Sequence, residues 1–294
     1  MLIDARTRHR AAGVVVALAL SGACAAVTPS ARVSRAVRPA QRSPVLSATS
    51  LESNDGVLGA ALLKAAAVPS AASFDAVGYR YYQLGVLDAA MKFYSRALAA
   101  NPHDVGALDG RARILRNWGQ LNDALGDASR ATYYGSQSPQ AWNTLGTIMQ
   151  MAGQSAEAAD AYRRAVALDD TAVYAMNNLC YLSFAAGAMD DAMEQCSQAL
   201  LVDDSFVPAR NNRGLVYAAS DEPARAFEDF SKAGPARANY NFGVVLMAER
   251  QYGAAAKAFE AAYQADPDFA AAHERARRAR LLDLTAKEIS HAGK

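Results

Sequence analysis

The sequence predicts an all-helical protein, built from about six pairs of helices and a closing helix. Three observations support this fold class. The chain is rich in alanine and poor in proline, a composition that favours helices. From residue 71 onward, the pattern of apolar and small residues repeats every 34 residues, and a glycine recurs at one place in four successive repeats. Two helices and a tight turn fit within this length, so each repeat is expected to be one helical hairpin.

Residues 1–26 have the features of an export signal. Arg6, Arg8 and Arg10 precede an apolar run from Ala11 to Leu20, and small residues follow. The run is too short for a transmembrane helix, which needs about 20 apolar residues. The mature protein is therefore expected to be exported, either as a periplasmic protein or as a lipoprotein anchored at the outer membrane.

Two processing routes remain open. The stretch from Leu20 to Cys24 is similar to a bacterial lipoprotein box, which would place a lipid on Cys24, but its leucine lies four residues before the cysteine instead of the usual three. Ala23-Cys24-Ala25 also fits the site of an ordinary signal peptidase, which would release a soluble protein. A lipid on Cys24 would be the expected means of membrane contact.

Residues 27–70 are expected to form a disordered leader that acts as a tether. They are rich in Ser, Ala, Pro, Arg and Val and show no sustained helical or strand period. Within the leader, Val57 to Ala67 has apolar residues at helical spacing. An alanine-rich linker is nevertheless the preferred interpretation of this stretch, because short isolated helices are marginal in water.

Six repeats follow the leader, and a helix closes them. The fifth repeat is five residues short, and the missing stretch falls at the end of its second helix, where Gly234-Pro235 stands. Residues 269–290 place apolar residues at helical spacing opposite a group of arginines, so they are expected to cover the last repeat with a polar face. The repeats span 71–104, 105–138, 139–172, 173–206, 207–235 and 236–268.

Small and aromatic residues within each repeat indicate how its two helices pack. A glycine such as Gly78 or Gly146 lets the helices approach closely, and an aromatic residue such as Tyr94 or Tyr162 fills the space between neighbours. The recurring turn glycines lie between the first and second helix of each hairpin, where a positive φ is expected. These are Gly85, Gly119, Gly153 and Gly187.

Cys180 and Cys196 both fall in the fourth repeat, at positions that should face one another across the hairpin. Two buried free thiols are the preferred interpretation. The alternative is a disulfide, which requires an oxidising compartment and Cα atoms within about 7 Å.

Composition and motifs argue against several classes of function. Positive and negative charges are nearly balanced, with 30 Lys and Arg against 29 Asp and Glu, and the repeats themselves are slightly acidic. Nucleic acid is therefore not an expected partner. The four histidines have no metal-ligand spacing, and no phosphate-binding or nucleophile motif is present. We expect no enzyme activity, no cofactor and no metal site.

The 34-residue period and its glycine, alanine and aromatic positions resemble the tetratricopeptide repeat. This resemblance implies a right-handed superhelical solenoid whose concave groove is lined by the first helices and binds proteins or peptides. An exported chain of this kind is similar to the small lipoproteins that assist Tad pilus assembly and to the pilotins of secretion pores. The resemblance therefore favours a scaffold for pilus or secretion-system assembly in the cell envelope. The alternatives are an adaptor that recruits cell-wall enzymes and, more remotely, a small-ligand carrier or an enzyme.

The resemblance also implies which residues line the groove. Asparagine occupies the sixth position of three repeats and the fifth position of three, and its amide can both donate to and accept from a peptide backbone. Aromatic residues of the fourth repeat add contact surface, and two arginines of the second could pair with an acidic group. Asp75 and Asp109 stand where the family's carboxylate clamp begins with a lysine, so a C-terminal acidic tail is not the expected ligand. The predicted residues are Asn178, Asn212, Asn241, Asn143, Asn177, Asn211, Tyr174, Tyr181, Phe184, Arg113 and Arg116.

Overall fold

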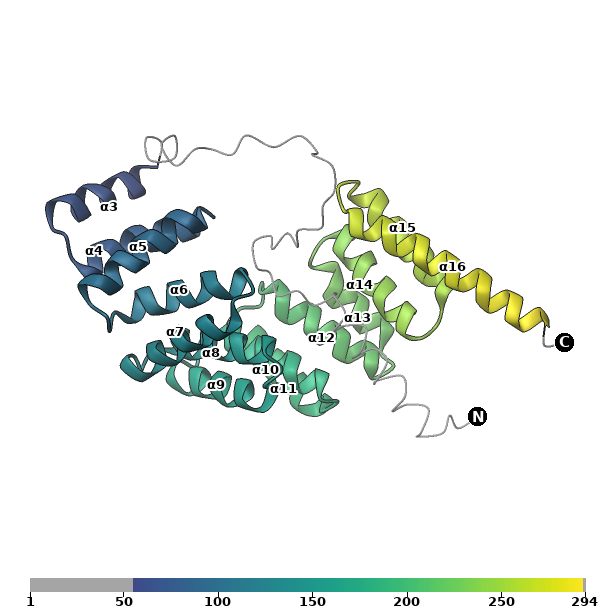
Figure 1. Ribbon diagram of the computed structural model, residues 1–294. Helices are drawn as coiled ribbons and strands as arrows, with labels where there is room; N and C mark the ends of the chain where they lie inside the picture. Colours follow the sequence, from purple (N-terminus) through teal and green to yellow (C-terminus); the bar gives the residue numbers. More distant parts are fainter. Residues whose placement is uncertain (1–54, 293–294) are drawn as a thin grey trace. The chain divides into compact units, whose positions relative to one another are not determined.

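The computed structural model describes residues 55–292, which are helical apart from short turns (Figure 1). This range contains fourteen helices and no strand, which confirms the all-helical fold class. None of the described helices is long and apolar enough to cross a membrane. The predicted export signal, Cys24 and residues 27–54 of the leader lie outside the described range.

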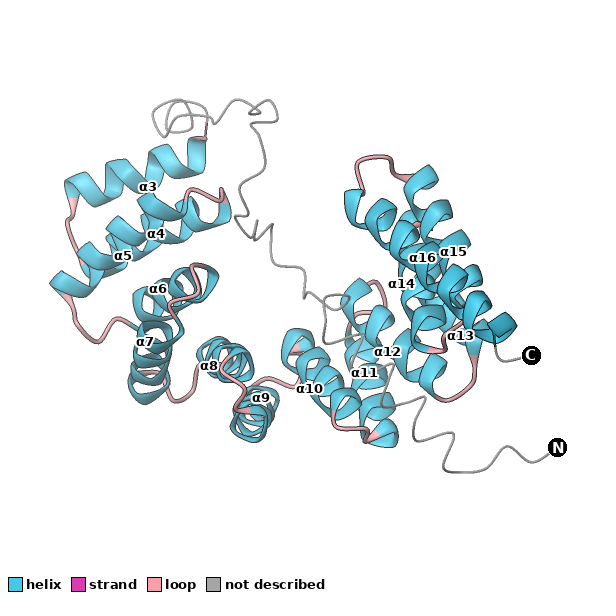
Figure 2. Cartoon of the chain, turned by 45° about the vertical axis from the view of Figure 1, so that its right-hand side comes forward, coloured by secondary structure: helices cyan, strands magenta, loops and turns pink. Residues whose placement is uncertain are grey.

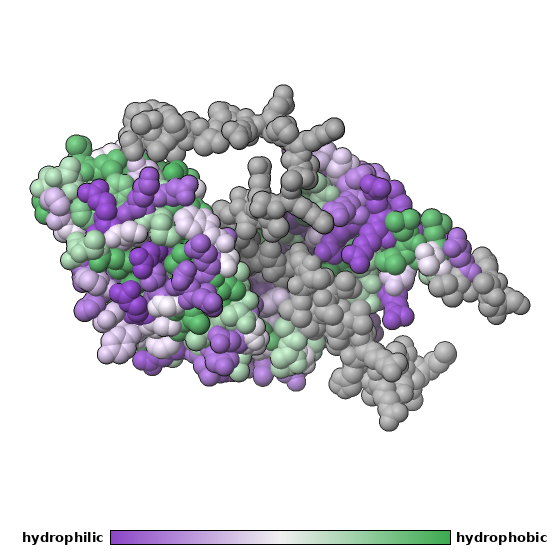
Figure 3. All heavy atoms as spheres, in the orientation of Figure 1, coloured by the Kyte–Doolittle hydropathy of each residue, from purple (hydrophilic) through white to green (hydrophobic). Residues whose placement is uncertain are grey.

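Residues 55–170 form one compact unit of seven helices. Each helix packs against the next one in the chain, and the first helices of consecutive repeats also contact one another. Over these helices, the face seen in Figure 3 carries hydrophobic and hydrophilic side chains in small intermingled patches. The helices are α3 (Gly56–Ala67), α4 (Ala71–Gln83), α5 (Leu87–Ala100), α6 (Val105–Asn117), α7 (Leu121–Tyr134), α8 (Pro139–Met151) and α9 (Ser155–Leu168).

Residues 171–292 form a second compact unit with the same construction. Short turns join the two helices of each hairpin (Figure 2). The first helices α10, α12 and α14 contact one another within this unit. The helices are α10 (Val173–Ala185), α11 (Met189–Val202), α12 (Val207–Ala219), α13 (Pro223–Ser231), α14 (Pro235–Ala248), α15 (Tyr252–Ala265) and α16 (Ala270–Ala292).

The interpretation of the leader as linker up to residue 70 is wrong for its last part, because α3 occupies Gly56–Ala67. Leu58 is fully buried and Ala65 is 5% exposed, and both belong to the core cluster that includes α4. Asp55 caps α3 by accepting a hydrogen bond from the Leu58 amide at 2.8 Å. The helix forms because α4 offers an apolar face on which a short, marginal helix can pack.

Glycine and an aromatic ring meet where the two helices of a hairpin are closest, as the sequence pattern predicts. A Cβ atom added to Gly78 would lie 2.7 Å from the Tyr94 ring, and one at Gly146 would lie 2.6 Å from the Tyr162 ring. Both distances are too short for any side chain larger than hydrogen. The same arrangement joins Gly214 to Phe230 and Gly243 to Phe259.

The four recurring turn glycines have φ values between 75° and 80°, so the predicted positive φ is confirmed. In the fifth and sixth repeats, Asp221 and Arg250 adopt the same left-handed conformation, with φ of 63° and 59°. The turn geometry is therefore retained in these two hairpins, although a side chain makes it less favourable.

The fifth repeat has the short second helix that its sequence length requires. Helix α13 contains 9 residues, whereas α11 and α15 contain 14 each. Gly234, with φ of 88°, turns the chain directly into α14. At the end of the chain, α16 buries Ala272, Ala276 and Ala279 against α15.

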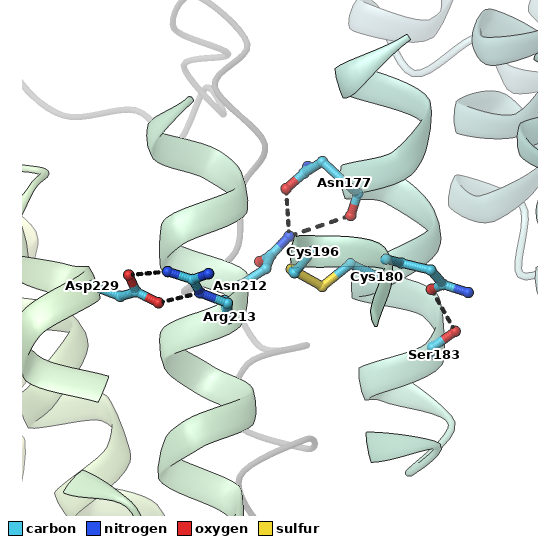
Figure 4. The surroundings of a disulfide bond; sticks show 8 residues. Asn177, Cys180, Ser183, Cys196, Asn212, Arg213 and Asp229 are labelled. Atoms are coloured by element: carbon cyan, nitrogen blue, oxygen red, sulfur yellow. Dashed lines mark hydrogen bonds and ion pairs between the residues drawn. A yellow bond between two sulfur atoms is a disulfide. The ribbon is translucent and has the colours of Figure 1, made fainter. Parts of the chain in front are cut away.

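Cys180 and Cys196 form a disulfide between α10 and α11, so the interpretation of two free thiols is wrong (Figure 4). Their Cα atoms are 5.3 Å apart, and both side chains are fully buried. The pair occupies the place where a glycine and an aromatic ring meet in other hairpins. The close approach of the helices there brings the two cysteines within bonding distance.

Candidate binding surface

Within each unit, the first helices of consecutive repeats form a continuous face, which we call the first-helix surface. It consists of α4, α6 and α8 in residues 55–170, and of α10, α12 and α14 in residues 171–292. All the predicted groove residues lie on these helices. Their burial and bonding differ, however, and these properties decide which of them a partner could contact.

The asparagines of the second unit pair across neighbouring helices. The Asn212 side-chain amide donates to the Asn177 side-chain oxygen at 2.9 Å and lies 3.4 Å from the Asn177 backbone oxygen (Figure 4). One repeat further, Asn241 donates to the Asn211 side-chain oxygen at 3.1 Å. Each pair joins the fifth position of one repeat to the sixth position of the next.

Burial separates the asparagines into two groups. Asn177 and Asn212 are 6% and 7% exposed, so their amides chiefly satisfy one another inside the protein. Asn178, Asn211 and Asn241 are half-buried, as is Asn143 on α8 in the first unit. The half-buried asparagines are therefore the ones with surface to offer to a partner, and three of them lie on α10, α12 and α14.

The aromatic residues of α10 also differ in accessibility. Tyr174 is 65% exposed, and its ring meets that of Phe206 edge-on at a centroid distance of 4.9 Å. Tyr181 is half-buried. Phe184 is only 1% exposed and packs in the core with the disulfide, so its predicted role as contact surface is wrong. Apolar residues occur all around α10, and the sequence alone does not reveal which of them point inward.

The two predicted arginines of α6 reach toward α8. Arg113 pairs with Asp109 at 2.9 Å and donates to the Thr144 hydroxyl at 3.1 Å. Arg116 donates to the Thr147 hydroxyl at 2.9 Å, and burial lowers the pKa of its guanidinium. Both arginines thus already have partners inside the first unit.

Sequence reasoning missed Thr144, Thr147 and Phe206 as parts of this surface. Thr147 stands one repeat after Arg113, at the same ninth position, so an alignment of every groove position would have shown it as a neighbour. Phe206 lies in the turn before α12, where the repeat pattern assigns no contact role. Only the fold reveals that it supports the Tyr174 ring.

Two observations bear on other kinds of site. Within residues 55–292, no group of three or more His, Cys, Asp or Glu side chains is placed to hold a metal ion. An open groove lies between α15 and α16, with charged side chains such as Lys257, Glu260, Arg280 and Asp283 on its walls. A shallow charged groove of this kind differs from the enclosed, largely apolar pocket typical of small-ligand sites.

Comparison with protein families supports the repeat assignment directly for one hairpin. Residues 236–269 match the family model for the tetratricopeptide repeat. These residues are the hairpin of α14 and α15 with the turn that follows it. No curated protein matches the sequence.

Solved structures show the same fold over a larger part of the chain. A chain in the crystal structure of the APC/C hetero-tetramer Cut9-Hcn1 is similar over 79% of this protein, with a TM-score of 0.65 and 19% identity. This protein spans only 47% of that chain's length. A tetratricopeptide repeat protein from Parabacteroides merdae is similar over 79% of this chain and 93% of its own, with a TM-score of 0.59 and 19% identity. At these identities the likeness concerns the fold.

Proposed function

Since residues 236–269 are a tetratricopeptide repeat and the chain has the fold of such proteins, we propose that this protein is a non-enzymatic scaffold that binds a peptide segment of a partner protein. The observation that carries the proposal is the combination of half-buried asparagine amides with an exposed tyrosine on α10, α12 and α14. Amides can bond an extended backbone of any sequence, and an exposed ring supplies contact area.

We further propose that the scaffold acts in the bacterial cell envelope, where it assists the assembly of a pilus or a secretion pore. The export signal predicted for residues 1–26 and the lipoprotein-like stretch that ends at Cys24 support this location. The Cys180–Cys196 disulfide supports it independently, because such bonds persist in oxidising compartments and are rare in the cytosol. An adaptor that recruits cell-wall enzymes is the alternative within the same class.

The partner can be identified by capture from envelope extracts with the exported chain as bait. Secretin or pilus subunits among the captured proteins would support the assembly role, whereas cell-wall hydrolases would support the alternative. Bound partner from neither group, together with enzymatic turnover by the purified chain, would contradict the proposal.

A matched pair of variants tests whether the captured partner uses the first-helix surface. Replacing Asn211 and Asn241 with alanine should weaken partner binding by about 1–3 kcal/mol, the scale of lost hydrogen bonds. Asn239→Ala serves as the control, since Asn239 lies on α14 two residues from Asn241, on another side of the helix, and bonds its own helix at Pro235. Equal affinity of both variants, with helical content unchanged, would place the binding site elsewhere.

A further inference from the structure

Two carboxylates lie close together on the first-helix surface of residues 55–170. Asp75 of α4 and Asp109 of α6 occupy the same position in consecutive repeats. The Asp75 carboxylate lies against the first turn of α6, so that a Cβ atom added to Gly106 would lie 2.7 Å from its Oδ2. Burial, together with the charges of Asp104 and Asp109, raises the pKa of Asp75 to about 6.

These carboxylates have more acceptor oxygens than the surrounding protein has donors. Asp75 is half-buried, and among the described residues neither a hydrogen bond nor an opposite charge contributes to its pKa. Asp109 uses Oδ2 to pair with Arg113, but its Oδ1 is buried without a hydrogen-bond partner among the described residues. Burial raises the pKa of Asp109, and the charge of Arg113 only partly offsets this effect. Buried carboxylate oxygens normally accept hydrogen bonds, so this site lacks at least one hydrogen-bond donor.

Aromatic residues flank the carboxylates on the same helix face. Tyr79 follows Asp75 by four residues, one turn along α4, and its side chain is 53% exposed. Tyr82 follows by seven residues and is half-buried. A guanidinium can lie over such a ring, and the same unit already contains one example, in which Arg96 lies 4.2 Å from the centre of the Phe74 ring.

None of the ionisable groups that the structure describes around Asp75 neutralises its negative charge. Asp104 and Asp109 are like charges, and burial raises the pKa of the nearby Tyr94, which stays neutral near neutral pH. Arg113 and Arg116 belong to α6, and they bond to Asp109 and to other side chains of α6 and α8.

We propose that Asp75, Asp109 and Tyr79 form a subsite within residues 55–170 for a cationic side chain of a partner peptide that contacts this unit, with arginine as its best occupant. This inference rests on the proposed function, which it deepens by naming the chemistry of the partner. A guanidinium can donate two parallel hydrogen bonds to the Asp75 carboxylate while its flat face covers the Tyr79 ring. A lysine ammonium would satisfy the charge but not the paired geometry.

The test uses N-acetylargininamide as the probe and its citrulline analogue as the control, because citrulline keeps the shape of arginine without its charge. In NMR titrations of the full chain at millimolar probe, the arginine compound should shift the Tyr79 ring signals and lower the apparent pKa of the Asp75 carboxyl. The citrulline compound should do neither. Equal shifts with both compounds would overturn the proposal.

A matched pair of carboxylate variants completes the test. Asp75→Asn should weaken binding of N-acetylargininamide at least tenfold, whereas Asp88→Asn, which removes an exposed charge on α5, should leave it unchanged. Identical behaviour of the two variants would show that only net charge matters and would refute the subsite. A partner that is captured in the Asn211 and Asn241 assay, yet binds Asp75→Asn normally, would leave the scaffold function standing and remove the cationic subsite alone.

Discussion

At the scale of single residues, the second and fifth repeats each have an ion pair between their two helices. Arg111 donates through Nε and Nη2 to Asp127 at 2.5 and 2.8 Å. One hundred and two residues later, at the same repeat positions, Arg213 binds Asp229 at 2.7 and 2.8 Å (Figure 4). The hydrogen bonds from Asp127 and Asp229 raise the pKa of their arginine partners. Bidentate pairs of this kind hold the two helices in a defined orientation.

Asp229→Asn should lower the free energy of unfolding because it leaves two arginines, Arg210 and Arg213, without a counter-charge. Loss of one partner from a buried pair costs about 3–5 kcal/mol, and since Arg213 is partly exposed we expect about 2–3 kcal/mol here. Asp160→Asn is the control, because its pair with Arg163 is exposed and should contribute less than about 0.5 kcal/mol. Urea unfolding of both variants measures the difference, and equal losses would contradict the expectation.

Asp75 should also make stability depend on pH. Its folded-state pKa of about 6 lies above the ordinary value of 3.8, so the folded protein holds this proton more tightly than the unfolded chain does. The carboxyl is protonated in both states below about pH 3.8, and its destabilising effect develops as the pH rises from about 4 to 6. Asp75→Asn should therefore stabilise the protein relative to wild type above pH 6, but not at about pH 4. A stability difference that does not change with pH would show that the carboxyl has an ordinary pKa.

At the scale of elements, α3 takes the place that the second helix of a preceding repeat would occupy beside α4. It packs on α4 as α5 packs on α6 and α7 packs on α8. Asp55 connects it further to α4, because its carboxylate accepts hydrogen bonds from the Arg80 guanidinium at 2.5 and 3.2 Å. In a repeat array, the apolar face of the first and of the last repeat must be covered by a further helix. Helix α3 covers the first repeat, and α16 covers the last one.

Removal of α3 should destabilise the first unit, although the sequence pattern predicts only a disordered tether up to residue 70. Leu58→Ala tests this with a single substitution, and we expect a loss of about 2–3 kcal/mol because the side chain is fully buried. Leu63→Ala, on the same helix but 73% exposed, provides the control and should have little effect. Indistinguishable thermal unfolding of the two variants would indicate that α3 does not contribute to the core.

At the scale of the whole molecule, the chain consists of two compact units with separate cores, and the disulfide lies entirely in the second. Its two cysteines are 16 residues apart in the sequence. In repeat proteins, stability is approximately a sum of local terms from each repeat and its neighbours. A change in this bond should therefore be felt mainly in residues 171–292.

Reduction of the disulfide should lower the stability of the second unit by about 3 kcal/mol, the entropic value for a loop of this length. Hydrogen exchange should become faster in α10 and α11 and in the neighbouring α12, while protection in α4 to α8 stays the same. Wild-type protein treated with reductant and a Cys180→Ala, Cys196→Ala variant should agree. Faster exchange throughout residues 55–170 would show that the two units unfold together.

The sequence by itself determined the hairpin repeat, the turn glycines, the glycine and aromatic pairs and the short fifth repeat. These features depend on spacing along the chain, because a 34-residue period places the same side chains at the same helix positions each time. A positive φ at Gly85 follows from the local geometry of the turn, and the close approach at Gly78 follows from the packing of two helices within one hairpin.

Only the tertiary structure decided the other contacts between helices. Asn177 and Asn212 look like surface residues in the repeat pattern, yet they bond one another in the interior, and Phe184 lies in the core although its position belongs to the groove. The folding of Gly56–Ala67 as α3 and the bonding of Cys180 to Cys196 likewise depend on contacts that no local pattern contains. A residue's burial is set by the neighbouring helix that covers it, and the sequence period specifies position without specifying that cover.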